Sequence, residues 1–246
     1  MAEQFRVLEA LAPGRIDLGV GRAPGADMRT ATLLNPNAYA AAEGFPQQIV
    51  DLQAWLAGQA HHGVVAHPRG EFEPVVWVLG SSDYGAQLAA HLGLPYAFAY
   101  FFTDGQGCEQ ALNLYRELYR PSAKHPVAQA TICVWALAAD TEDEARHQAL
   151  SRERWRVDRQ RGRLGPLLAP DEIAARGFTP EELAFVQAGR AKAFVGDAAQ
   201  VAAGLRRVAA EFALDELVVN TWATEPAVRR HSYALLAREL IDSAVA

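Results

Sequence analysis

The sequence predicts an α/β fold in which parallel strands are joined by crossover helices. Short apolar runs rich in β-branched or aromatic residues alternate with segments whose apolar residues recur at helical spacing. This alternation is typical of parallel sheets covered by helices. Five strands are expected, near residues 16–20, 75–79, 96–102, 130–138 and 216–221. Both a (β/α) barrel and an open doubly wound sheet fit this order, although a closed barrel needs eight strands.

The helices expected before residue 120 follow from apolar periodicity and from the residues that punctuate it. Pro46 suits the first turn of the second of these helices, and Gly93 stops the third. The expected ranges are 3–11, 45–56, 84–92 and 108–119.

After residue 140 the pattern continues with one interruption. Helices are expected over 142–156, 181–190, 199–212 and 227–241. Arg159–Pro180 carries three glycines and three prolines without a sustained period. A segment of this kind after a helix is typical of a mobile lid.

Composition limits the classes of protein and partner. The chain has 246 residues, half of them apolar, and a net charge of −6, which argues against a nucleic acid or an anionic membrane as partner. The N-terminus has no apolar signal core, and no apolar run approaches the length of a membrane span. The two cysteines, Cys108 and Cys133, give no disulfide framework. These features together predict a cytoplasmic location.

The stretch Val75–Gly93 predicts a strand, a tight turn and a helix. Gly80 permits the turn, and Ser81 and Ser82 place two hydroxyls at the start of the helix. Free backbone N–H groups and the positive end of the helix make such a turn an anion site, usually for phosphate. An ordinary βα turn with a good helix cap is the alternative.

A second basic signal lies after the first expected strand. The glycines of Gly19–Gly25 do not have the G-x-G-x-x-G spacing of a dinucleotide site, because the third falls one residue late. Arg22, however, follows the carboxyl end of a strand, where ligands bind in parallel α/β folds. It can hold a phosphate by two parallel hydrogen bonds, or it can pair with a surface carboxylate.

Two other groups of residues indicate structure rather than chemistry. His61, His62 and His67 lie in a loop with no carboxylate at ligand spacing, so no metal site is expected. Six arginines are expected to form a solvated helix face and loop rather than an anion site; they are Arg152, Arg154, Arg156, Arg159, Arg161 and Arg163.

Several motifs, in order along nearly the whole chain, carry a family resemblance. They are the block Ala2–Gly25 ending in GRAPG, FPQQIVDL at Phe45–Leu52, VWVLGSSDYGAQLAAHLGLP at Val76–Pro95, and AFVGD at Ala193–Asp197. Together they resemble the bacterial luciferase-like family of flavin-dependent monooxygenases, in the branch that carries GRxPG and LGSS.

The resemblance implies a TIM (β/α)8 barrel, reduced FMN, O2 and a small organic substrate, or the deazaflavin F420 in a sister branch. It implies that Ser81, Ser82 and Tyr84 hold the flavin phosphate with Arg22, so the expected cofactor-binding set is Arg22, Gly80, Ser81, Ser82 and Tyr84. It further implies one luciferase-like domain over residues 1–246 with a late insertion or mobile loop at 157–192, a homodimer, and a separate flavin reductase as partner.

The departure from the family is at the front of the chain. Members carry about three further strands before the first helix found here, which accords with five strands against eight. The catalytic residues of the family are expected there, so none is assigned. An open sheet exposes edges and an apolar face, so we expect the chain alone to be poorly soluble or paired. A non-catalytic flavin-binding protein or an inactive fragment remains the alternative of a different class.

Overall fold

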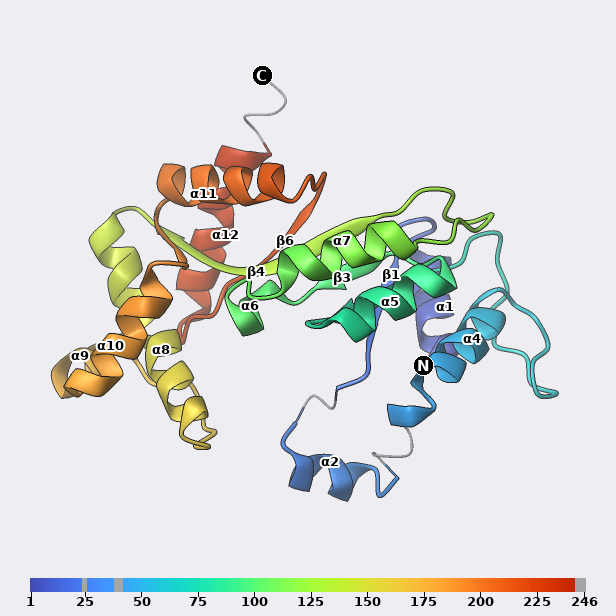
Figure 1. The fold of residues 1–246 in the computed structure, drawn as a ribbon, viewed down its shortest axis with the longest axis horizontal. Coiled ribbons are helices and arrows are strands. Elements are labelled where there is room, and N and C mark those ends of the chain that lie inside the picture. Colours follow the sequence, from blue (N-terminus) through green and yellow to red (C-terminus); the bar gives the residue numbers. More distant parts are fainter. Residues whose placement is uncertain (24–25, 38–41, 242–246) are drawn as a thin grey trace. The chain divides into compact units, whose positions relative to one another are not determined.

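The computed structural model describes residues 1–23, 26–37 and 42–241, which form two compact units (Figure 1). The first unit comprises Met1–Ala99 and Gly107–Ala130, and the second comprises Tyr100–Gln106 and the chain from Thr131 onward. The expectation of a single domain over residues 1–246 stays a prediction.

The first unit is a parallel sheet with helices on it. Its elements in chain order are α1 (Ala2–Leu11), β1 (Asp17–Gly21), α2 (Met28–Leu34), α4 (Phe45–Leu56), β2 (Val75–Gly80), α5 (Asp83–Leu92), β3 (Tyr96–Phe98) and α7 (Cys108–Leu118). Strand β2 pairs in parallel with β1 on one side and with β3 on the other.

The core of the first unit lies between the sheet and the side-by-side helices α5 and α7 (Figure 1). Three alanines on α5, Ala86, Ala89 and Ala90, are fully buried, and their small side chains let the helix approach the strands closely. The hydroxyl of Tyr115 on α7 donates to the carbonyl of Leu94 at 2.9 Å, so this buried polar group is satisfied.

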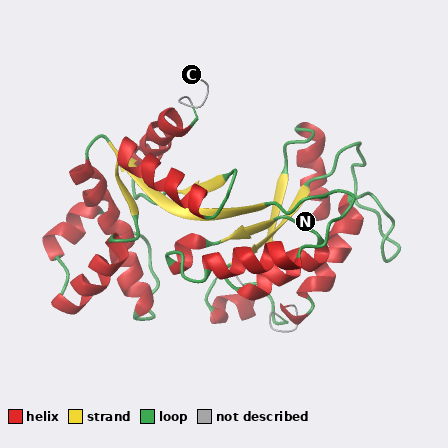
Figure 2. Cartoon of the chain, turned by 45° about the horizontal axis from the view of Figure 1, so that its top comes forward, coloured by secondary structure: helices red, strands yellow, loops and turns green. Residues whose placement is uncertain are grey.

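The second unit is also built on parallel strands. Its elements are α6 (Tyr100–Thr103), β4 (Ala130–Ala139), α8 (Glu142–Gln160), α9 (Pro170–Arg176), α10 (Pro180–Arg190), β5 (Phe194–Asp197), α11 (Ala198–Glu211), β6 (Leu217–Asn220) and α12 (Pro226–Leu240). Strand β4 pairs in parallel with both β5 and β6. Figure 2 shows all strands of the chain in yellow and its helices in red.

Helix starts in the second unit agree with their sequence signals. The Thr141 hydroxyl accepts from the Glu144 N–H at 3.2 Å, as expected for an N-cap. Both α10 and α11 begin with a capping box, formed by Thr179 with Glu182 and by Asp197 with Gln200.

The predicted α/β class with a parallel sheet is confirmed, and the five predicted strands lie where expected. The predicted number of strands is too low. The described residues contain six strands, because Phe194–Asp197 forms β5. This strand has only four residues and includes a glycine, so its local pattern is weak. The strand expected over 96–102 ends at Phe98, and Tyr100–Thr103 is a helical turn instead.

Three other differences concern helices. Helices α2 and α9 were not expected, and α8 runs to Gln160 rather than to residue 156. Of the range 157–192, expected to be an insertion or mobile loop, much is therefore helical, in the end of α8 and in α9 and α10. Mobility of this range stays a prediction.

Candidate functional site

The two signals predicted from sequence leave the sheet at the same edge. Strands β1 and β2 are parallel, and Gly21 is the register partner of Leu79. Arg22 follows Gly21 directly, and Gly80 follows Leu79. Two turns from distant parts of the sequence therefore begin side by side at the carboxyl ends of neighbouring strands, where ligands bind in parallel α/β folds.

Arg22 lies over the ring of Tyr84. The central guanidinium carbon is 4.1 Å from the centroid of that ring, which is a cation–π contact. Arg22 is exposed, and among the described residues no carboxylate forms an ion pair with it. The alternative reading, an arginine neutralised by a surface carboxylate, therefore finds no support in the described residues. Pro24 and Gly25 of the same loop lie outside them.

The start of α5 leaves several hydrogen-bond donors free. Ser82 is the N-cap residue with an extended backbone (φ −153°, ψ 167°), and its side chain makes no capping hydrogen bond. Ser81 and Ser82 are both exposed. The first-turn amides of a helix have no intrahelical partner and carry partial positive charge. Hydroxyl and amide donors are thus available near Arg22.

The carboxylate at this helix start already has a hydrogen-bond partner. Asp83 is the first residue of α5, and the side-chain amide of Gln110 on α7 donates to its carboxylate at 2.6 Å. This bond holds the carboxylate towards α7. Gln110 is a contributor that sequence reasoning missed, and no local pattern could have identified a contact across 27 residues.

The turn between β2 and α5 is tightly packed. A Cβ atom at Gly80 would lie 3.3 Å from the Cα atom of Gly85 and 3.5 Å from the ring of Tyr96. The Tyr96 hydroxyl also donates to the Ser82 carbonyl at 3.4 Å. Gly80 thus lets the turn close against the first turn of the helix.

A hollow of about 1510 Å³ borders Arg22 within the first unit. Its lining is largely apolar and includes Val20, Phe45, Ile49 and Leu52. Of the five predicted cofactor-binding residues, Arg22 lines this hollow; Gly80, Ser81, Ser82 and Tyr84 are not among its lining residues. The arrangement sets a cationic group at the border of an apolar space, as sites for organic anions require.

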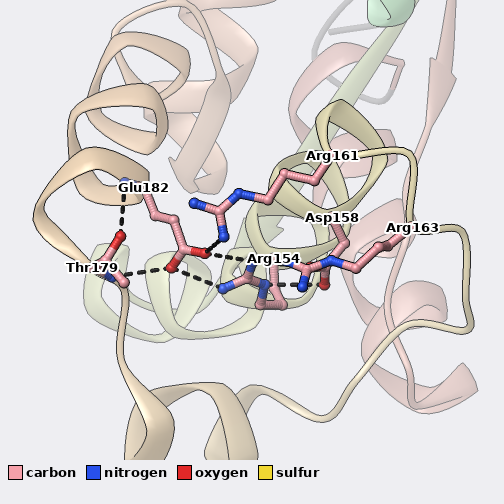
Figure 3. A network of polar contacts seen from close by, with 6 residues as sticks. All are labelled: Arg154, Asp158, Arg161, Arg163, Thr179 and Glu182. Carbon is pink, nitrogen blue, oxygen red and sulfur yellow. Dashed lines mark hydrogen bonds and ion pairs between the residues drawn. The ribbon is translucent and has the colours of Figure 1, made fainter.

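Only part of the arginine run is the solvated helix face and loop that was expected, because Arg159, Arg161 and Arg163 are exposed but the start of the run on α8 is not. Arg152 and Arg154 are about 95% buried. Arg154 donates to both oxygens of Glu182 at 3.0 Å and to Asp158 (Figure 3). Arg161 and Arg163 add further ion pairs to Glu182 and Asp158. Helix periodicity brings Asp158 within reach of Arg154, but it could not reveal Glu182, which lies 28 residues away on another helix.

Two pKa shifts accompany these contacts. The Arg154 guanidinium and the Thr179 N–H lower the pKa of the Glu182 carboxyl to about 2. Burial, with Arg156 nearby, lowers the pKa of Arg152 to about 10, although Asp104 opposes the shift. Both groups therefore stay charged at neutral pH, and the network is a structural one.

No metal site was expected near His61 and His62, because the sequence shows no carboxylate at ligand spacing to them. The fold, however, brings one there. Asp51 on α4 brings its Oδ1 atom to 2.9 Å from His61 Nε2 and 3.8 Å from His62 Nε2. The carboxylate lies ten residues earlier, on a helix, and the loop returns to it. His67 is not part of this group.

No described helix combines the length and the apolar character needed to cross a membrane.

Comparisons of this chain with known proteins agree on one family. A family model described as luciferase-like monooxygenase matches residues 1–216. A curated relative from Escherichia coli (strain K12), named luciferase-like monooxygenase, is 39% identical over 236 residues, covering 96% of this chain and 70% of the relative. The crystal structure of apo-MsnO8 superposes with a TM-score of 0.85 at 29% identity, over 97% of this chain and 72% of that one.

Two more distant solved structures show the fold alone. One is the oxygenating constituent of a diketocamphane monooxygenase from a Pseudomonas putida plasmid in complex with FMN, at 15% identity and a TM-score of 0.61, over 98% of this chain and 74% of that one. The other is an F420-dependent secondary alcohol dehydrogenase, at 13% identity and a TM-score of 0.59, over 97% of this chain and 72% of that one.

Proposed function

Because the chain belongs to the luciferase-like monooxygenase family, we propose that it is an FMN-dependent monooxygenase that acts with O2 on a small organic substrate. The observation that carries the proposal is the position of Arg22. An exposed guanidinium without a carboxylate partner among the described residues lies against Tyr84, in the first turn of a helix that offers unused donors.

In this proposal the phosphate of reduced FMN occupies the edge where β1 and β2 end. Arg22 donates two parallel hydrogen bonds to it, and Tyr84 holds the guanidinium plane in place. Ser81 and Ser82 donate their hydroxyl protons, and the first-turn amides of α5 complete the anion site. Gly80 allows the close turn on which both serines sit. These donors suit a dianion, and the residues that carry them bind the cofactor without taking part in the chemical step.

The bound flavin would supply the redox chemistry, and the protein the environment. The hollow beside Arg22 has a largely apolar lining that an organic ring would contact. We assign no catalytic base among these residues. A homodimer and a separate flavin reductase remain part of the proposal as expected partners.

F420 is the alternative cofactor, in an oxidoreductase that transfers hydride without O2. Both cofactors carry phosphate, so the same anion site serves either one. The Gly80-Ser81-Ser82 turn is the feature on which we favour FMN. A flavin-binding protein without turnover is the remaining alternative, and it is distinguished by binding of FMN without O2-dependent oxygenation of an organic substrate.

Titration of the purified chain with FMN, riboflavin and F420 tests the proposal. One charged hydrogen bond to phosphate contributes at least about 1.5 kcal/mol, so FMN should bind at least about tenfold more tightly than riboflavin, which lacks the phosphate. Equal affinity for FMN and riboflavin would reject the phosphate site. Binding of F420 in preference to FMN would select the alternative.

A further inference from the structure

A carboxylate and two imidazoles meet in the first unit, at residues that the proposed phosphate site does not use. One ligand atom from each of Asp51, His61 and His62 lies within 4.8 Å of the other two. Oδ1 of Asp51 is 2.9 Å from Nε2 of His61 and 3.8 Å from Nε2 of His62. Among the residues that the structure describes, this is the group of three that could hold a metal ion.

The backbone fixes the two histidines. His61 and Val64 exchange two hydrogen bonds of 2.9 Å, one in each direction. Between them His62 and Gly63 have φ of +50° and +75°, as in a two-residue turn of the type I′ class. The Trp55 indole N–H donates to the His61 carbonyl at 3.3 Å and ties the turn to α4. The imidazoles are therefore presented by a defined turn.

A hydrogen bond explains only part of this arrangement. The contact of His61 with Asp51 has hydrogen-bond length, but the His62 contact of 3.8 Å to the same oxygen does not. The two imidazole rings also lie with their centroids 4.1 Å apart. A cation between the three ligand atoms accounts for both histidines at once.

The distances suit a small divalent metal. Ligands at about 2.0–2.1 Å from Zn²⁺ lie roughly 3–4 Å from one another around the ion. Imidazole nitrogen and carboxylate oxygen are ligands that Zn²⁺ accepts. Gln47 donates to Asp51 Oδ1 at 2.8 Å, the kind of outer hydrogen bond that orients a ligating carboxylate. The His62 side chain is 69% exposed, so water can complete the coordination.

We propose that Asp51, His61 and His62 bind a divalent transition-metal ion of the Zn²⁺ type. The ion is held by three protein ligands and solvent, and it clamps the turn at residues 61–64 to helix α4. Other histidines of the described chain provide contrast. His147 with Asp171 and His231 with Asp140 form two-residue pairs at 2.9 and 3.0 Å, without a third ligand.

Isothermal titration of the full chain with Zn²⁺ alone tests the proposal, and Co²⁺ serves as a spectroscopic probe of the ligand set. We expect one equivalent of Zn²⁺ per chain. His62→Gln and Asp51→Asn should each weaken binding by at least about tenfold, since even outer-shell changes cost about 10–100-fold. His67→Gln, in the same loop but outside the cluster, should leave the affinity unchanged.

His62→Gln decides the outcome if Asp51→Asn does not fold, because the exposed His62 side chain is not needed for packing. The proposal is overturned if no saturable Zn²⁺ binding is found, or if His62→Gln binds as tightly as the unaltered chain. It is equally overturned if His67→Gln abolishes binding, because the metal would then occupy another site.

Discussion

The change Glu182→Gln removes the charge at the centre of the buried ion network. Glu182 is 6% exposed and accepts from two nitrogens of Arg154 at 3.0 Å, and the Arg154 side chain is 5% exposed. Breaking a buried pair by removing one partner costs about 3–5 kcal/mol, because the other charge stays buried. Asp158 still neutralises part of Arg154, and glutamine retains the acceptor for the Thr179 N–H. We therefore expect Glu182→Gln to lower the free energy of unfolding by about 3 kcal/mol.

Urea unfolding followed by tryptophan fluorescence measures this loss, and in thermal unfolding it corresponds to about 6–12 °C for a chain of this size. Glu181→Gln is the matched control. It removes an equal charge from the same helix turn, but at an exposed position, so its effect should stay within about 0.5 kcal/mol. A loss for Glu182→Gln no larger than that of the control would refute the reasoning.

Three further changes have expected outcomes. Because the folded pKa of Glu182 is depressed to about 2 from 4.5, its stabilisation is present above pH 4.5 and is lost as the pH falls towards 2; unfolding curves of Glu182→Gln should be less steeply pH-dependent in that window. Gly80→Ala should cost about 1–3 kcal/mol by overpacking the β2–α5 turn, whereas Gly165→Ala, with open space around its Cβ, should be neutral by thermal unfolding. Gln110→Ala frees the Asp83 carboxylate at the anion site, so FMN titration should show weaker binding, and unchanged affinity would contradict the role given to Gln110.

Local periodicity sufficed for the framework of the fold. The range of α4 agrees to the residue with the expected helix, because Pro46 and the stripe of Ile49, Leu52 and Leu56 mark it clearly. The two turns after β1 and β2 could also be predicted, since strand ends and glycine-rich turns have strong local signals. The pairing of β1 with β2 places these turns side by side, and local sequence patterns do not reveal that pairing.

The features that sequence reasoning missed depend on contacts between distant residues. Strand β5 is too short to show a pattern of its own, and its pairing with β4 determines it. The burial of Arg154 requires Glu182 on another helix, and the cluster at His61 requires Asp51 on α4. In each case the deciding partner lies on another element, beyond the reach of local spacing.

The affinity of the double variant Arg22→Ala/Ser82→Ala for FMN and for riboflavin tests the phosphate site most directly. Each hydrogen bond to a charged group contributes about 1.5–3 kcal/mol, so loss of those that Arg22 and Ser82 donate costs at least about 3 kcal/mol, which raises the FMN dissociation constant at least about 150-fold. Riboflavin has no phosphate to lose, so its affinity should stay the same. Unchanged FMN affinity, or an equal fall for both ligands, would contradict the assignment of Arg22 and Ser82 to the phosphate.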